Sequence, residues 1–222
     1  MDLETRHTDL AELVRGASWK QLFSTLYRLA LVRYGTHRLL NPVNIKIATK
    51  RKLKKLVNLG YLSVNPTGVY TVTPKCLNLL KEHGYNTKIL QKDFTGQGTG
   101  DTLVKSAVIL NIMRDPDFYS VFYPNFTYLI PDACIVYKKG DKARLAFLEV
   151  EQEKGNWQMY LEKKRENYLK LAREVEVYSK WWKRWSGLLD MNYCKPEEFC
   201  FSVLCYSDIR FHWEGWEFER IK

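Results

Sequence analysis

Apolar positions in the first ninety residues recur with a helical period. Three or four positions separate the apolar residues of 18–34, which predicts an amphipathic helix ended by Gly35. Residues 45–59 repeat the pattern with an apolar face and a basic remainder, and Gly60 provides a usual carboxyl-terminal stop. A further helix is expected over residues 74–83, because proline suits its first position. The start of the chain is therefore expected to be mainly helical.

One β-hairpin pattern interrupts these helices. Residues 61–64 and 69–72 are rich in β-branched and aromatic side chains, and the Asn-Pro-Thr-Gly sequence between them favours a turn. Thr73 then suits the N-cap of the next helix. The predicted order is a helix, a basic helix, a two-stranded wing and a further helix. This order resembles a winged helix-turn-helix. The resemblance implies a DNA-binding domain over residues 1–85.

The second half of the chain alternates between helical and strand patterns. Glycine recurs within residues 86–100, which we interpret as a flexible linker. An apolar helix is expected over residues 102–114 and a long helix from residue 156 to about 178. Strands are expected at 119–123, 133–137, 144–151 and 199–206. We therefore predict a second domain over residues 101–222, of α/β class with a mixed central sheet, in a chain that is α+β as a whole.

The composition is that of a folded protein, with 45% hydrophobic and 14% aromatic residues. No apolar run approaches the roughly 20 residues of a membrane span, so no membrane contact is expected. The acidic amino-terminal segment lacks the pattern of a secretion signal, so we expect a cytoplasmic protein. The five cysteines form no CxxC pair and lie among apolar residues, which favours buried free thiols over a zinc site.

The positive charge is concentrated in the first half. Residues 1–100 contain 16 lysines and arginines against 6 acidic residues, whereas residues 101–222 contain 19 of each. Six cations and no acid fall within residues 45–59, which favours contact with the phosphates of double-stranded DNA. The alternative is a solvated helix face. The cations are Lys46, Lys50, Arg51, Lys52, Lys54 and Lys55.

Three carboxylates fall where two predicted strands meet. Asp132 begins one strand, and Glu149 and Glu151 lie at the end of its hairpin partner, two residues apart and therefore on one face. Like charges this close raise one another's pKa unless a cation joins them, and hard divalent ions such as Mg²⁺ or Mn²⁺ are suited to oxygen ligands. In the alternative, these strand-end carboxylates simply point into water.

The long helix that follows carries a cation on its apolar face. Lys164 falls on the stripe formed by Trp157, Leu161, Tyr168, Leu171 and Val175. A lysine at a core-facing position either extends its amine to solvent or meets an acid. The carboxylates of the sheet are the acids that Lys164 would meet.

These residues resemble a nuclease motif. The PD-(D/E)xK superfamily has Pro-Asp on a strand and Glu-x-Lys on the hairpin partner, packed against a helix. Pro131-Asp132 and Leu148-Glu149-Val150-Glu151 follow this pattern, except that Glu151 stands in place of the usual lysine. Some branches carry the lysine on the following helix, as Lys164 would. The resemblance implies a restriction-endonuclease-like domain.

The whole plan, over roughly residues 18–172, resembles the replication-relaxation family of plasmid and mobile-element proteins, including Lys164-x-x-x-Tyr168. The resemblance implies DNA binding, with partners among replication or relaxase proteins. If the site is active, Asp132 and Glu149 would hold Mg²⁺ or Mn²⁺, with Glu151 as a third ligand. Lys164 would orient the attacking water or stabilise the developing charge. The alternatives are a non-catalytic accessory factor and a transcriptional regulator.

An aromatic segment follows the long helix. Trp181, Trp182 and Trp185 are interleaved with two cations, which suits stacking on unpaired bases. They also fall on one helical face, and we favour packing or contact between two copies of the chain. The segment 211–216 is interpreted as a core strand and turn.

Overall fold

A computed structural model describes residues 7–90, 99–139, 142–151, 156–189, 200–207 and 211–219. The chain divides into two compact units, Met1–Leu110 and Asn111–Lys222. Residues 91–98, in the predicted linker, lie outside the described residues. The division falls inside a helix whose Ser106 hydroxyl donates to the carbonyl of Val32, 3.2 Å away, in the first unit. Within the described residues, no helix has the length and apolar character needed to cross a membrane.

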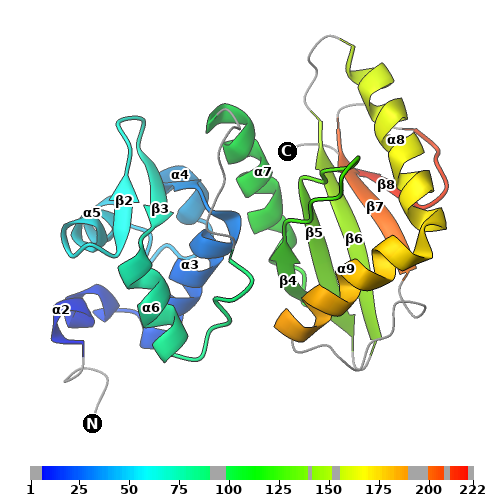
Figure 1. The fold of residues 1–222 in the computed structure, drawn as a ribbon. Helices are drawn as coiled ribbons and strands as arrows, with labels where there is room; N and C mark the ends of the chain where they lie inside the picture. The colour runs from blue at the N-terminus through cyan, green and yellow to red at the C-terminus, as the bar shows by residue number, and fades with distance from the viewer. Residues whose placement is uncertain are drawn as a thin grey trace. The chain divides into compact units, whose positions relative to one another are not determined.

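The first unit is mainly helical with one small sheet (Figure 1). The sheet has the order β1-β3-β2, and both pairings are antiparallel. In chain order the elements are α2 (Thr8–Ala11), η1 (Glu12–Val14), α3 (Trp19–Val32), β1 (Gly35–Thr36), α4 (His37–Leu40), α5 (Lys50–Asn58), β2 (Leu62–Val64), β3 (Val69–Val72), α6 (Pro74–Glu82) and α7 (Thr99–Ile112).

Helix α3 begins where the sequence predicts it and ends earlier. The Ser18 side chain accepts from the Gln21 amide, while the Gln21 side chain accepts from the Ser18 amide, which makes a capping box. The predicted stop at Gly35 is wrong: α3 ends at Val32, and the next residue, Arg33, has a positive φ of 69°. Gly35 instead pairs with Tyr70 in β1, a two-residue strand that its own pattern does not reveal.

The predicted hairpin and the helix after it are confirmed. Strands β2 and β3 pair from Leu62 opposite Val72 to Val64 opposite Tyr70. The Asn65 side chain closes the turn by accepting from the amide of Val69 at 2.9 Å.

The second unit is built on a mixed sheet, as predicted, and this sheet has five strands. The strand order is β4-β5-β6-β7-β8, in which β5 is antiparallel to both β4 and β6, whereas β7 runs parallel to both β6 and β8. The elements are β4 (Phe118–Phe122), β5 (Ala133–Lys139), β6 (Lys142–Val150), α8 (Trp157–Arg173), α9 (Val175–Leu188), β7 (Cys200–Tyr206) and β8 (Trp216–Glu219).

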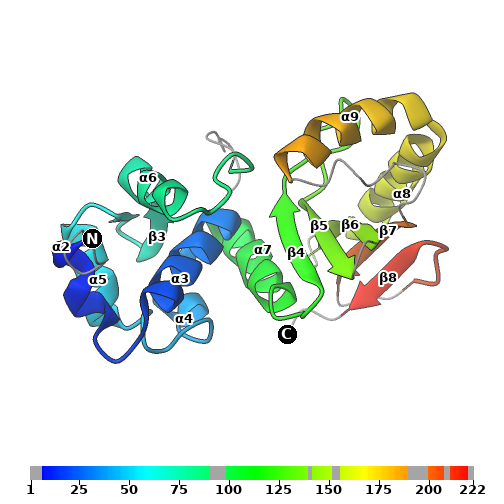
Figure 2. The same ribbon diagram turned by 90° about the horizontal axis from the view of Figure 1, so that it is seen from below.

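Two helices cover one face of this sheet, as Figures 1 and 2 show from two directions. The single long helix expected up to residue 178 is wrong: the chain breaks at Glu174, where ψ is 64°, and α9 begins. The Tyr128 hydroxyl donates to the Glu174 carboxylate at 2.7 Å and ties the break to the loop before β5. On α9, Trp182 is buried and Trp185 stacks on Phe122 with ring centroids 4.7 Å apart. These two tryptophans therefore pack in the core.

Two smaller expectations have different outcomes. Cys76, Cys134 and Cys205 are buried free thiols, as predicted; the side chains of the other two cysteines lie outside the described residues. The segment 211–216 is not a core strand: a turn leads into β8, whose residues alternate between half-buried and exposed.

Candidate acidic site and candidate nucleic-acid interface

The ends of β5 and β6 bring Asp132 and Glu149 together. The Asp132 amide donates to the carbonyl of Leu148 at 3.0 Å, directly before β5 begins. The Asp132 carboxylate accepts from the backbone amide of Val150, the residue that follows Glu149, at 2.8 Å. The antiparallel register of the hairpin, with Ala133 opposite Leu148, fixes this proximity. The sequence argument correctly placed both acids at one point.

Glu149 is fully buried and both of its carboxylate oxygens are hydrogen-bonded. One oxygen accepts from the Lys164 ammonium at 2.5 Å, and the other accepts from the Tyr168 hydroxyl at 2.7 Å. Both donors come from α8, one helical turn apart. A carboxylate at 0% exposure is costly unless it is paired in this way.

Lys164 joins the two glutamates. Its ammonium also donates to Glu151 at 2.8 Å, and its side chain is 13% exposed. Leu161, Tyr168 and Leu171 on the same stripe of α8 are buried, so the expectation of an inward-facing lysine that meets the sheet's acids is confirmed. The structure therefore contains the predicted interaction of Lys164 with Glu149 and Glu151, and the charge of Asp132 also acts on this lysine. The catalytic roles of these residues remain predictions.

Burial and neighbouring charges set the ionisation of the cluster. Burial, joined by the Asp132 charge, raises the pKa of Glu149 to about 7, against the opposing effect of Lys164. Burial works to lower the pKa of Lys164, but the charges of Glu149, Asp132 and Glu151 outweigh it and raise that pKa. Lys164 therefore stays protonated, and Glu149 is the member that titrates near neutral pH.

The cluster provides oxygen donors and a surplus of negative charge. Three carboxyl groups, those of Asp132, Glu149 and Glu151, act on a single ammonium, that of Lys164, so acidic groups outnumber the cation. This donor chemistry fits a hard divalent ion. Among the described residues, however, the structure contains no group of three or more Asp, Glu, His or Cys side chains arranged to hold a metal ion. Asp132 and Glu149 are the residues that would hold one.

Sequence reasoning placed Tyr168 in the apolar stripe and in the Lys-x-x-x-Tyr motif but assigned its hydroxyl no contact. Its hydroxyl fixes the second oxygen of Glu149, and its ring contacts Phe147 on β6 with centroids 5.6 Å apart. The available signal was the spacing of four from Lys164, which places a hydroxyl and an amine on one face of the helix.

The predicted basic helix is shorter than expected. Helix α5 covers Lys50–Asn58 and is capped by Thr49, whereas residues 45–47 form a turn, so Lys46 does not lie on the helix. The Asn44 side chain accepts from the amide of Lys46 at 3.0 Å, and this local bond competes with helix formation.

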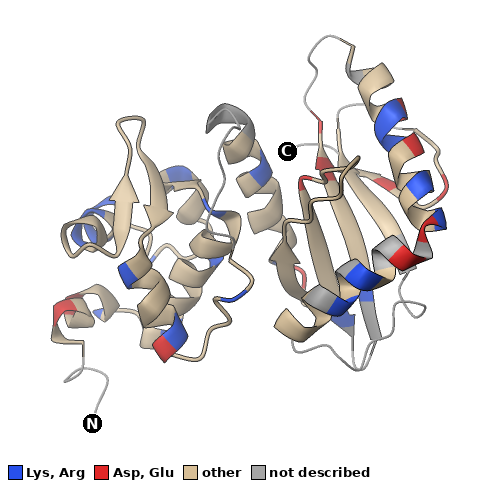
Figure 3. Ribbon diagram, viewed as in Figure 1, with Lys and Arg blue, Asp and Glu red and all other residues tan. Residues whose placement is uncertain are grey.

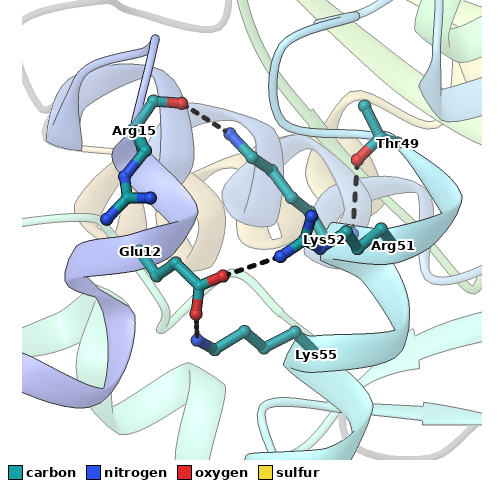
Figure 4. Close-up of polar contacts among 6 residues, drawn as sticks. All are labelled: Glu12, Arg15, Thr49, Arg51, Lys52 and Lys55. Carbon is teal, nitrogen blue, oxygen red and sulfur yellow. Dashed lines mark hydrogen bonds and ion pairs between the residues drawn. The ribbon is translucent and has the colours of Figure 1, made fainter.

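The remaining five cations divide between two sides of α5, on which basic residues are concentrated (Figure 3). On one side, Glu12 of η1 forms ion pairs with Arg51 and Lys55, and the Lys52 ammonium donates to the carbonyl of Arg15 at 3.1 Å (Figure 4). On the other side, Lys50 and Lys54 are exposed and make no ion pair within the described part of the chain. The sequence argument missed the acidic partner because Glu12 is 39 positions from Arg51 and 43 positions from Lys55.

Comparison with protein-family models, curated proteins and solved structures found no match to this chain.

Proposed function

We propose that the chain is a DNA-binding protein of a plasmid or other mobile element, whose second unit hydrolyses phosphodiester bonds with the help of Mg²⁺ or Mn²⁺. It would act in the cytoplasm, in replication initiation or DNA processing. The observation that carries the proposal is the meeting of Asp132, Glu149 and Lys164. The resemblance to the PD-(D/E)xK and replication-relaxation families adds support, because it requires these residue types at the ends of a hairpin and on the following helix.

The roles follow from the contacts. Asp132 is oriented by the Val150 amide and Glu149 by Tyr168, so both acids are fixed in place to hold an ion, with Glu151 as a third ligand. A bound ion supplies an activated water and neutralises charge on the phosphate. Lys164 stays protonated and would stabilise the negative charge that develops on the phosphate oxygens.

The first unit would supply DNA binding through the exposed side of α5. Lys50 and Lys54 have no ion-pair partner among the described residues and lie one turn apart. Each lysine that contacts a phosphate contributes about 1 to the slope of log affinity against log salt concentration. Substituting both with alanine should lower the slope by about 2 on duplex DNA of any sequence. An unchanged slope would remove these lysines from the interface.

Cleavage is tested on supercoiled, linear, nicked and single-stranded DNA with Mg²⁺ or Mn²⁺. We expect metal-dependent cutting of at least one form, and its loss in Asp132→Ala and in Glu149→Gln. Glu162→Gln is the matched control, because Glu162 is an exposed acid on α8. Absence of cutting on all four forms would refute the nuclease, as would cutting that survives in both variants.

A second candidate function is a non-catalytic accessory factor that binds DNA together with replication or relaxase proteins. The specific observation in its favour is that the Lys164 ammonium already bridges Glu149 and Glu151, which completes an internal ion cluster. Calorimetry separates the two candidates. A nuclease should take up Mn²⁺ in a manner that depends on Asp132, whereas the accessory factor should not. A plain transcriptional regulator would explain the first unit only.

A further inference from the structure

A pocket of about 180 Å³ opens between η1 and the start of α5. Its lining is Glu12, Leu13, Arg15, Thr49, Arg51, Lys52 and Lys55. Figure 4 shows the two elements facing each other, with the Glu12 carboxylate between them. Both elements belong to the first unit, so the pocket is formed without the second.

The cations of the pocket already bind one anionic group, the carboxylate of Glu12. The two carboxylate oxygens of Glu12 accept from different cations: Oε1 accepts from Arg51 at 3.1 Å, and Oε2 accepts from Lys55. Arg51 and Lys55 lie one helical turn apart on α5. The Lys55 hydrogen bond and charge, followed by the charges of Arg51 and Arg15, hold the pKa of Glu12 below its ordinary value. An arrangement that grips both oxygens of a carboxylate also suits a phosphate, which offers more oxygens at similar spacing.

One carboxylate does not neutralise this pocket. Four cationic side chains line it against the single charge of Glu12, which leaves a surplus of three positive charges. Lys52 is partly buried, and burial lowers its pKa, so its ammonium would gain from an additional anion. Arg15 makes no ion pair among the described residues. A dianion matches this surplus better than a second carboxylate would.

We propose that this pocket binds a phosphomonoester, supplied either by the 5′ end of a DNA strand or by a free nucleotide. The pocket would accept a terminal phosphate. The Glu12 carboxylate occupies part of the pocket until the phosphate displaces it. Neither Lys50 nor Lys54 lines the pocket, so the pocket would bind a strand end through other residues than those proposed to contact duplex phosphates. The DNA-end source rests on the proposed DNA binding, whereas the free-nucleotide source does not.

The test compares two short duplexes that differ only in a 5′-phosphate or a 5′-hydroxyl, by fluorescence anisotropy at fixed salt. We expect the phosphorylated duplex to bind about tenfold more tightly, in line with new charge-assisted hydrogen bonds. Arg15→Ala should abolish this preference, and Glu12→Gln should increase it by removing the competing anion. Lys50→Ala is the matched control and should weaken both duplexes equally, with their ratio preserved.

A second arm titrates a nucleoside monophosphate, the parent nucleoside and inorganic phosphate against wild type and Arg15→Ala, with thermal shift as the readout. In one outcome, the phosphorylated compounds stabilise wild type but not Arg15→Ala, while the 5′-phosphate and 5′-hydroxyl duplexes bind equally. That result would assign the pocket to free nucleotides. Equal binding of the two duplexes together with no phosphate response overturns the proposal. Failure of the proposed DNA binding would look different, because neither duplex would bind at all.

Discussion

The sharpest prediction concerns the ammonium that neutralises the buried glutamate. Replacing Lys164 with methionine keeps an unbranched stem of similar length but removes the charge beside Glu149, which is fully buried. Removal of one partner from a buried ion pair costs about 3–5 kcal/mol, because the other charge is left uncompensated. Protonation of Glu149 offers partial relief, so we expect the free energy of unfolding at pH 7.5 to fall by about 3 kcal/mol.

The loss should depend on pH and on Glu149. Burial raises the pKa of Glu149 to about 7 in the wild type, so at pH 5.5 this acid is mostly neutral and less charge is left unpaired. The difference between wild type and Lys164→Met should therefore narrow at pH 5.5. Adding Glu149→Gln to Lys164→Met should restore most of the lost stability at pH 7.5, because the fully buried carboxylate that lost its ammonium partner is then gone.

Urea unfolding followed by tryptophan fluorescence measures this cycle. Six of the seven tryptophans lie in the second unit and only Trp19 lies in the first, so the signal follows the unit that contains the site. Lys163→Met is the control, since that lysine is exposed on the same helix and should change stability by less than about 0.5 kcal/mol. A loss below about 1 kcal/mol for Lys164→Met, or no recovery in the double variant, would refute the proposed energetics.

Three further predictions concern pH, capping and backbone conformation. Because the pKa of Glu149 rises from 4.5 in the unfolded chain to about 7, its contribution to stability is complete below pH 4.5 and is lost as pH rises through 7; Glu149→Gln should flatten this fall in urea titrations from pH 5 to 8. Thr73→Ala removes the side chain that accepts from the Cys76 amide, and should cost about 1 kcal/mol by thermal unfolding, with Thr67→Ala in the exposed turn as a comparison. Gly60 has φ of 76°, so Gly60→Ala should cost about 1–2 kcal/mol in the same assay, and a neutral result would contradict the strain argument.

Local signals predicted most of the elements. The hairpin of β2 and β3, the cap of α6 and the strands β5 and β6 each depend on turn residues, capping residues or alternation within a few positions. The acidic site was also predictable, because two carboxylates two residues apart on a strand and a lysine on an apolar stripe restrict each other's positions once the strands are paired.

Long-range contacts account for what the sequence did not show. Strand β1 has only two residues and exists because Gly35 reaches Tyr70 across the small sheet. At the helix break, the Glu174 carboxylate accepts a hydrogen bond from Tyr128, which lies 46 positions earlier. The cations of α5 are equivalent in the sequence, and only the folded position of Glu12 divides them into a paired side and an open side.

The lysine of the acidic site stands on a helix, while the acids stand on the sheet. A lysine on the same strand as its acids would be held to them by the strand's own backbone, but here the separation depends on how α8 lies against β6. A helix that slides by one residue moves its side chains by about 1.5 Å, which is enough to break a hydrogen bond. Anything that shifts α8, whether DNA, a protein partner or a core substitution, would therefore open or close the site without touching it.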